Sequence, residues 1–164
     1  MIILGIDPGI ARVGWGAVKD DLGKQVAIDY GCFETSASLS LDDRLAKIHK
    51  FVIGLIEKFK PNVLAVEQLY FAANVKTALT VGQARGVIIL AGAKANLQTV
   101  SYTPLQVKQA LTGYGRADKK QIGMMVKSIL NLPKVITQDD TADALAVALT
   151  HAFSYKMHSI TQKK

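Results

Sequence analysis

Residues 2–9 read IILGIDPG, and this stretch decides how the rest of the chain is interpreted. The residues before Asp7 are apolar and do not alternate with polar ones, which predicts a strand buried on both faces of a sheet. Pro8 and Gly9 suit a sharp turn, since one fixes φ and the other frees it. Asp7 therefore stands where the strand leaves the sheet, either as a turn former or as a rigidly held functional carboxylate.

The composition predicts one globular domain. The chain has 164 residues, of which 49% are hydrophobic and 20% charged, a balance typical of folded rather than disordered chains. We expect a single domain over residues 1–157, followed by a polar tail at 158–164. No apolar run approaches the ~20 residues of a membrane helix, and we expect no signal peptide. Cys32 is the single cysteine, which favours a reducing compartment, and we expect the cytoplasm.

The positive charge of the chain is concentrated in its middle. Residues 67–138 carry nine basic and two acidic side chains, whereas residues 1–66 and 139–164 are each balanced. A local basic field indicates a polyanionic partner, with nucleic acid the leading candidate. A surface that merely keeps the protein soluble is the alternative, although interspersed charges would suit that role better.

The hydrophobic pattern predicts an α/β fold. Three strands up to about residue 35 read as an antiparallel meander. A helix capped by Ser40 and ended by Pro61 then leads to an apolar strand at 62–66. A strand–helix–strand unit places the new strand parallel to an earlier one, and a fifth strand follows at 98–102. On the third strand, a period of two places four residues on one face: Val26, Ile28, Tyr30 and Cys32.

Four more helices are expected after about residue 74. The first, at about 74–96, is rich in small residues, so it is buried against the sheet or packs closely on a second subunit. The others begin at Pro104, at Asp118 and near Asp140, and the last runs to about Tyr155.

Acidic residues stand at the ends of several predicted elements. Glu67 follows the fourth strand as Asp7 follows the first, and Asp140 and Asp143 open the last helix on one shared face, whereas Asp139 points off it. Helix capping would explain the two helix acids but not Glu67. Four converging carboxylates need a cation, and oxygen ligands suit Mg²⁺ or Mn²⁺. Two such ions ~4 Å apart activate a water and stabilise the leaving oxygen of a phosphodiester.

Four stretches of the chain closely resemble the RuvC family of Holliday-junction resolvases, in that family's order and spacing. They are residues 5–9 (GIDPG), 66–68 (VEQ), 82–87 (GQARGV) and 140–148 (DTADALAVA). The resemblance covers nearly the whole chain. It implies a ribonuclease-H-like fold with a mixed five-stranded sheet, three antiparallel strands and then parallel ones, flanked by helices.

The resemblance also implies an activity. It is the resolution of four-way DNA junctions by paired symmetric nicks, in homologous recombination and DNA repair. A homodimer carries it out with Mg²⁺, Mn²⁺ being an expected substitute and two ions per active site the expected number. Residues 82–95 would form part of the dimer contact, and a branch-migration helicase complex of the RuvA and RuvB type is the expected partner.

Individual residues take roles by the same comparison. The family's four acidic metal ligands map onto Asp7, Glu67, Asp140 and Asp143. Lys108 and Lys119 match lysines near the scissile phosphate, and Tyr70 matches an aromatic that stacks on an opened base. Arg116 and Lys120 are their neighbours and would add phosphate contacts.

Other classes of function compete with this reading. A non-catalytic scaffold would bind junctions without nicking them, although the intact acidic set argues against it. A nucleotide-binding fragment of the actin and sugar-kinase type also begins with a strand, an Asp and a Gly-rich turn, but that type needs two such domains. Ser-His-Asp hydrolysis has little support, because the three histidines lie outside any nucleophile motif.

Overall fold

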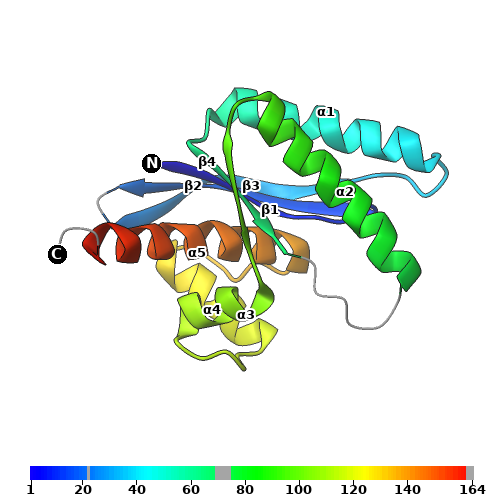
Figure 1. The fold of residues 1–164 in the computed structure, drawn as a ribbon. Coiled ribbons are helices and arrows are strands. Elements are labelled where there is room, and N and C mark those ends of the chain that lie inside the picture. Colours follow the sequence, from blue (N-terminus) through cyan, green and yellow to red (C-terminus); the bar gives the residue numbers. More distant parts are fainter. Residues whose placement is uncertain (22, 69–74, 162–164) are drawn as a thin grey trace.

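The computed structural model describes residues 1–21, 23–68 and 75–161, without the side chains of 75–77 and 156–161. Within these ranges a sheet carries helices on both faces (Figure 1). The strands are β1 (Ile2–Asp7), β2 (Arg12–Asp21), β3 (Lys24–Glu34), β4 (Val63–Glu67) and β5 (Gln98–Tyr102). The helices are α1 (Leu41–Phe59), α2 (Val75–Lys94), α3 (Pro104–Thr112), α4 (Lys119–Ile129) and α5 (Asp139–Thr161).

The sheet has the order β3-β2-β1-β4-β5, so β1 is its central strand. β1, β2 and β3 pair antiparallel, whereas β4 lies parallel to β1 and β5 parallel to β4. This mixed sheet confirms the predicted fold class. Ile6 pairs with Val66, so the two strands end side by side and the acids that follow, Asp7 and Glu67, are neighbours.

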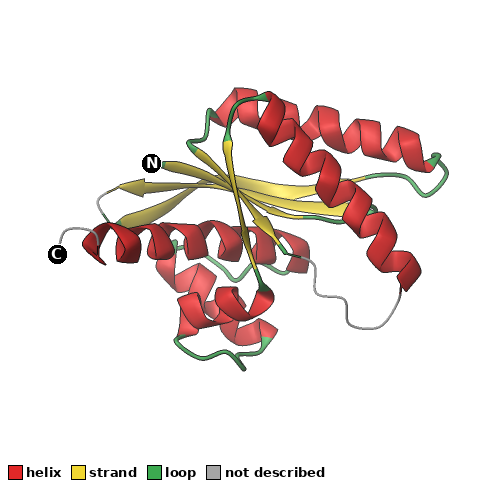
Figure 2. Cartoon of the chain, in the orientation of Figure 1, coloured by secondary structure: helices red, strands yellow, loops and turns green. Residues whose placement is uncertain are grey.

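Two apolar cores lie on opposite faces of the sheet. α1 and α2 cover one face, and α5, with α3 and α4 beyond it, covers the other (Figure 2). Leu4, Ile6 and Leu64 belong to the first core, and Ile3 and Ala65 to the second, all with no exposed surface. This two-sided burial explains why β1 and β4 are apolar without alternation.

The predicted helix starts coincide with real caps. The Ser40 hydroxyl accepts a hydrogen bond from the backbone N–H of Asp43 at 3.3 Å. Asp118 and Gln121 form a reciprocal capping box at the start of α4. α5 extends to Thr161, beyond the predicted end near Tyr155. Among the described residues, no helix is long and apolar enough to span a bilayer.

The prediction of one shared face on β3 is wrong. Asp29 pairs with Ala17, but the next pair joins Ala27 to Val18, so Ile28 is an extra residue in the strand. Such a bulge interrupts the alternation of side chains, so the period of two does not carry from Val26 to Cys32.

α2 divides its small and apolar residues between two faces. Ala84, Ile88 and Ala91 are fully buried in the core shared with α1 and the sheet. Leu79 and Leu90 are 65% and 52% exposed, and eleven residues, close to three helical turns, bring them to the same side. The helix is therefore buried against the protein on one side and offers an apolar strip on the other.

Candidate active site

Asp7 and Glu67 form the centre of the site at the carboxyl ends of β1 and β4. Both side chains are half-buried, and their carboxyl groups are close enough to share a hydrogen bond. Burial, followed by the negative charge of Glu67, raises the pKa of Asp7 to about 9. Burial also raises the pKa of Glu67. One proton is therefore held between the two carboxyl groups at neutral pH.

The amino end of α5 reaches this centre because glycines allow it to approach the sheet. Gly14 is the register partner of Asp7, and a Cβ on Gly14 would collide with the backbone carbonyl of Asp140. A Cβ on Gly5 would likewise collide with the carbonyl of Ala144. The negative charges of Asp143 and Asp140 both contribute to the raised pKa of Asp7. The four acids singled out by the sequence thus gather at one end of the sheet.

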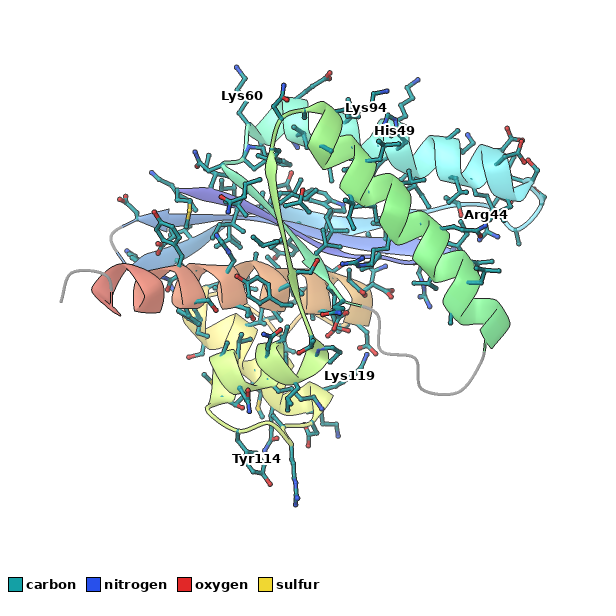
Figure 3. All side chains as sticks on the ribbon, viewed as in Figure 1. Arg44, His49, Lys60, Lys94, Tyr114 and Lys119 are labelled. Carbon is teal, nitrogen blue, oxygen red and sulfur yellow. The ribbon has the colours of Figure 1, made fainter. Side chains whose placement is uncertain are left out.

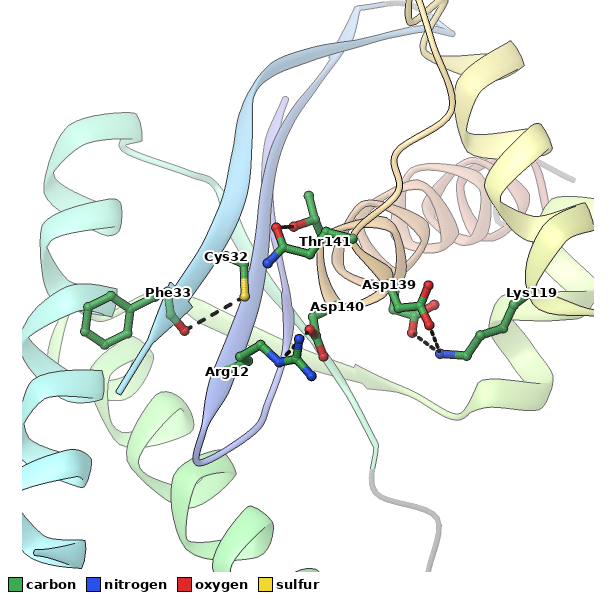
Figure 4. Close-up of polar contacts among 9 residues, drawn as sticks. Arg12, Cys32, Phe33, Lys119, Asp139, Asp140 and Thr141 are labelled. Carbon is green, nitrogen blue, oxygen red and sulfur yellow. Dashed lines mark hydrogen bonds and ion pairs between the residues drawn. The ribbon is translucent and has the colours of Figure 1, made fainter. Parts of the chain in front are cut away.

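Asp140 and Asp143, at the start of α5, each form an ion pair with a different cation (Figure 4). Arg12 Nε lies 3.4 Å from Asp140 Oδ2. Lys119 Nζ lies 3.3 Å from Asp143 Oδ2 and 3.4 Å from Asp139 Oδ2. Asp139, which was expected to point off the face shared by Asp140 and Asp143, contacts the same lysine as Asp143, and its i, i+4 spacing brings it toward α4.

These ion pairs affect the charge states of their members. Burial raises the pKa of Asp143, although the nearby Lys119 opposes the shift. Burial works against the charge on Lys119, but Asp143 and Asp139 outweigh it and raise the pKa of that lysine. Among the residues whose side chains are described, no three His, Cys, Asp or Glu lie in an arrangement that could hold a metal ion. Arg12 and Lys119 form ion pairs with Asp140 and Asp143, two carboxylates that such a site would need.

The donor set nevertheless has the chemistry of a divalent-cation site. All four candidate ligands are carboxylates, the oxygen donors that Mg²⁺ prefers. Burial and mutual proximity raise the pKa of Asp7 and burial raises that of Glu67, and a cation between the two carboxylates would offset the same cost of charge. The site fits a hard metal ion provided that Asp140 or Asp143 leaves its present partner.

The predicted DNA-binding residues that the structure describes lie on α3, on α4 and on the loop between them. Lys108 is half-buried on α3, whereas Arg116, Lys119 and Lys120 are exposed. Lys119 points from α4 toward the acidic end of α5 (Figure 3). A pocket of about 140 Å³ between α4 and α5 is lined by Lys119 and Lys120. Tyr70 lies outside the described residues.

Residues without a sequence-derived role also contribute to the site. Arg12 pairs with Asp140, and Arg85 donates hydrogen bonds to the backbone of Glu67 and to Ser101. Gly14 admits α5. Gly14 and Gly16 alternate within β2, and glycines in a strand indicate close approach of another backbone. No local signal marks Arg12, because its partner lies far along the chain.

Comparison with known proteins gives a consistent family assignment. The family model described as "Crossover junction endodeoxyribonuclease RuvC" matches residues 3–151. The chain is 51% identical to the crossover junction endodeoxyribonuclease RuvC of Halothermothrix orenii, covering 96% of each chain. It is 50% identical to that of Ruminiclostridium cellulolyticum, covering 98% of this chain and 96% of the relative.

Solved structures agree with the fold described above. A Thermus thermophilus RuvC structure superposes with a TM-score of 0.88 at 37% identity, covering 96% of this chain and 97% of the other. A T. thermophilus RuvC in complex with a Holliday junction substrate gives 0.88 at 35% identity, covering 96% of each. The yeast mitochondrial Holliday junction resolvase Ydc2 shares the fold, with a TM-score of 0.67 at 17% identity, covering 99% of this chain and 84% of the other.

Proposed function

This chain belongs to the RuvC family of crossover junction endodeoxyribonucleases, and on that premise we propose that it resolves Holliday junctions at the acidic end of β1 and β4. The reaction is hydrolysis of phosphodiester bonds, and two symmetric nicks separate the joined duplexes. It serves homologous recombination and DNA repair. The single observation that carries this assignment of the site is the pair of half-buried carboxyl groups, Asp7 and Glu67, at the ends of adjacent parallel strands.

The four acids are the proposed catalytic ligands of divalent metal. Mg²⁺ is the proposed ion, with Mn²⁺ as a substitute and two ions per site. When bound, the metal supplies an activated water and neutralises the charge of the leaving oxygen. Asp7 and Glu67 would hold the ion from the two strand ends. Asp140 and Asp143, which now pair with Arg12 and Lys119, would complete the ligand set.

Metal binding at the four acids would give Arg12 and Lys119 a second role. Arg12 and Lys119 are largely exposed and pair with carboxylates, so a metal ion at the acids would release both. Released cations next to the reacting bond suit phosphate oxygens. Lys119 therefore neutralises Asp143 in the free protein and binds the substrate strand near the scissile phosphate during the reaction, together with Lys108.

The rest of the DNA surface continues from this point. Arg116 lies on the loop between α3 and α4, and Lys120 lies on α4 beside Lys119. Both extend the phosphate contacts along the DNA strand. Tyr70 is proposed to stack on an opened base near the junction centre, a contact worth ~1–3 kcal/mol. The distribution of charge supports this placement of the DNA-binding surface, because the positive excess of the chain lies between residues 67 and 138.

Two copies of the chain are proposed to act together. The exposed strip of α2 around Leu79 and Leu90 supports a two-fold contact, which would set two active sites against the two symmetry-related strands of a junction. A branch-migration complex of the RuvA and RuvB type is the proposed partner in the cytoplasm. Residues 1–157 form the proposed nuclease domain, and residues 158–164 its polar tail.

The proposal is tested with a synthetic four-way junction and Mg²⁺. The parent protein should cut two opposite strands, and Asp7→Asn should bind the junction equally but leave it intact. Asp29→Asn is a matched control, because Asp29 pairs with Lys58 on the surface and should nick like the parent. Equal nicking by Asp7→Asn would refute the site. Tight binding by the parent without nicks in any divalent ion would favour the non-catalytic scaffold.

A further inference from the structure

Arg85 links α2 to the active-site end of the sheet. Its Nε donates a hydrogen bond to the main-chain carbonyl of Glu67 at 3.2 Å, and its Nη2 donates one to Ser101 Oγ at 2.7 Å. Glu67 is the last residue of β4, and Ser101 lies one position before the end of β5. One guanidinium group therefore spans the ends of two neighbouring strands.

No backbone donor stands opposite the carbonyl of Glu67. Glu67 pairs with Tyr102 in register, and the last backbone hydrogen bond between β4 and β5 runs from the Gln68 N–H to the Tyr102 carbonyl at 2.8 Å. Successive residues of a strand direct their backbone groups to opposite sides, so the carbonyl of Glu67 faces β1 and not β5. There Pro8 follows Asp7 and has no N–H to donate. Arg85 provides a charged donor to this carbonyl.

A fixed backbone matters at this position. Glu67 and Asp7 stand side by side at the ends of adjacent parallel strands, with Asp143 and Asp140 nearby. The end of β1 cannot fix the Glu67 backbone, because Pro8 follows Asp7 without an N–H. A rotation of the Glu67 backbone would swing its carboxylate away from the other acids.

We infer that Arg85 is a positioning residue that holds Glu67 in place for metal binding. This inference rests on the proposed function, because it takes Glu67 as a metal ligand. Arg85 does not touch the metal or the substrate; it acts through the main chain of Glu67. Arginine suits the task because its planar fork presents two donors at a fixed angle, whereas one lysine ammonium does not match both acceptors in that geometry.

The experiment measures metal binding directly. Mn²⁺ affinity is measured by electron paramagnetic resonance on the whole chain without DNA. The Mg²⁺ concentration for half-maximal nicking and the junction affinity in EDTA are measured alongside. Arg85→Gln should weaken Mn²⁺ binding roughly tenfold and raise the Mg²⁺ midpoint by a similar factor, as loss of a metal ligand's supporting partner does. Its junction affinity in EDTA should stay at the parent value.

Controls separate the possible outcomes. Lys50→Gln removes an exposed charge from α1 and should match the parent in all three measurements. Arg85→Lys keeps the charge and should fall between the parent and Arg85→Gln; should Arg85→Gln fail to fold, weakened Mn²⁺ binding by Arg85→Lys carries the test. Parent-like Mn²⁺ affinity in the folded Arg85 variants would overturn the inference, and lost junction affinity with intact Mn²⁺ binding would make Arg85 a DNA contact instead.

One further variant tests the premise by itself. Glu67→Gln should lose Mn²⁺ affinity more severely than Arg85→Gln. If Glu67→Gln binds Mn²⁺ like the parent, the ligand assignment of the proposed function fails, whatever Arg85→Gln shows. If Glu67→Gln loses Mn²⁺ and Arg85→Gln keeps it, only the positioning role of Arg85 fails.

Discussion

Gly14→Ala should disable the nuclease without altering any acidic or basic residue. Gly14 lies opposite Asp7 in the sheet and directly beneath the backbone of Asp140. The added methyl group would fall well inside the 3.0 Å limit that real Cβ atoms respect. Its obstacle is the Asp140 backbone, which has no rotamer to change, so α5 must move away from the strand ends.

The structure sets the size of the effect. Ordinary van der Waals contact begins at about 3.4 Å, so the start of α5 must shift by at least about 1 Å. A misplacement of about 1 Å in a catalytic arrangement costs about 10²-fold in rate, equivalent to about 2.7 kcal/mol of barrier. Overpacking should also lower the free energy of unfolding by about 1–3 kcal/mol, or roughly 2–12 °C in melting temperature for a chain of this size.

Gly16→Ala is the matched control on the same strand. Its methyl group would meet the side chain of Leu145 at 2.5 Å and the Leu145 Cα only at 3.5 Å, so rotation of that side chain can relieve the contact. Single-turnover nicking of a four-way junction in saturating Mg²⁺ compares the two variants. Gly14→Ala should be about 100-fold slower than Gly16→Ala, although both are destabilised. Rates within about threefold of each other would show that the approach of α5 does not set the catalytic geometry.

The other predictions concern charge, proton and subunit contacts. Without divalent cations, the melting temperature should fall as pH rises from about 4 to about 9, because the folded protein keeps a proton on Asp7 that the unfolded chain has released. Asp7→Asn should flatten this dependence of melting temperature on pH, and an unchanged slope in that variant would contradict the shared proton. Lys119→Gln should slow nicking but change the unfolding free energy by at most about 1 kcal/mol, since its ion pairs are exposed; parent-like nicking would remove Lys119 from the reaction. Leu90→Glu should yield monomers in analytical ultracentrifugation and separate, unpaired nicks, whereas the control Lys24→Glu, an exposed residue at the start of β3, should stay dimeric. A dimeric Leu90→Glu would place the contact elsewhere.

Local patterns in the sequence predicted most of the elements. Unbroken apolar runs marked β1 and β4, because strands covered on both faces have no polar side to show. Ser40 and Asp118 marked helix starts because their side chains accept orphan N–H groups of the first turn. Pro104 marked another because proline at the first helical position has no N–H to leave unpaired. The wrong prediction of one shared face on β3 also has a local cause, because the extra residue Ile28 reverses the alternation of side chains. The sequence pattern of β3 did not indicate this bulge.

The chain alone therefore determined which carboxylates stand at the ends of elements, and the resemblance to a family gave them roles. Only the tertiary structure decided their neighbours. Asp7 and Glu67 meet because β4 lies beside β1, and Asp140 reaches them because Gly14 removes a side chain. Arg12 reaches Asp140 across more than a hundred residues of chain. Such contacts depend on strand order and helix docking, which arise from burial summed over the whole core and not from the periodicity of any one segment.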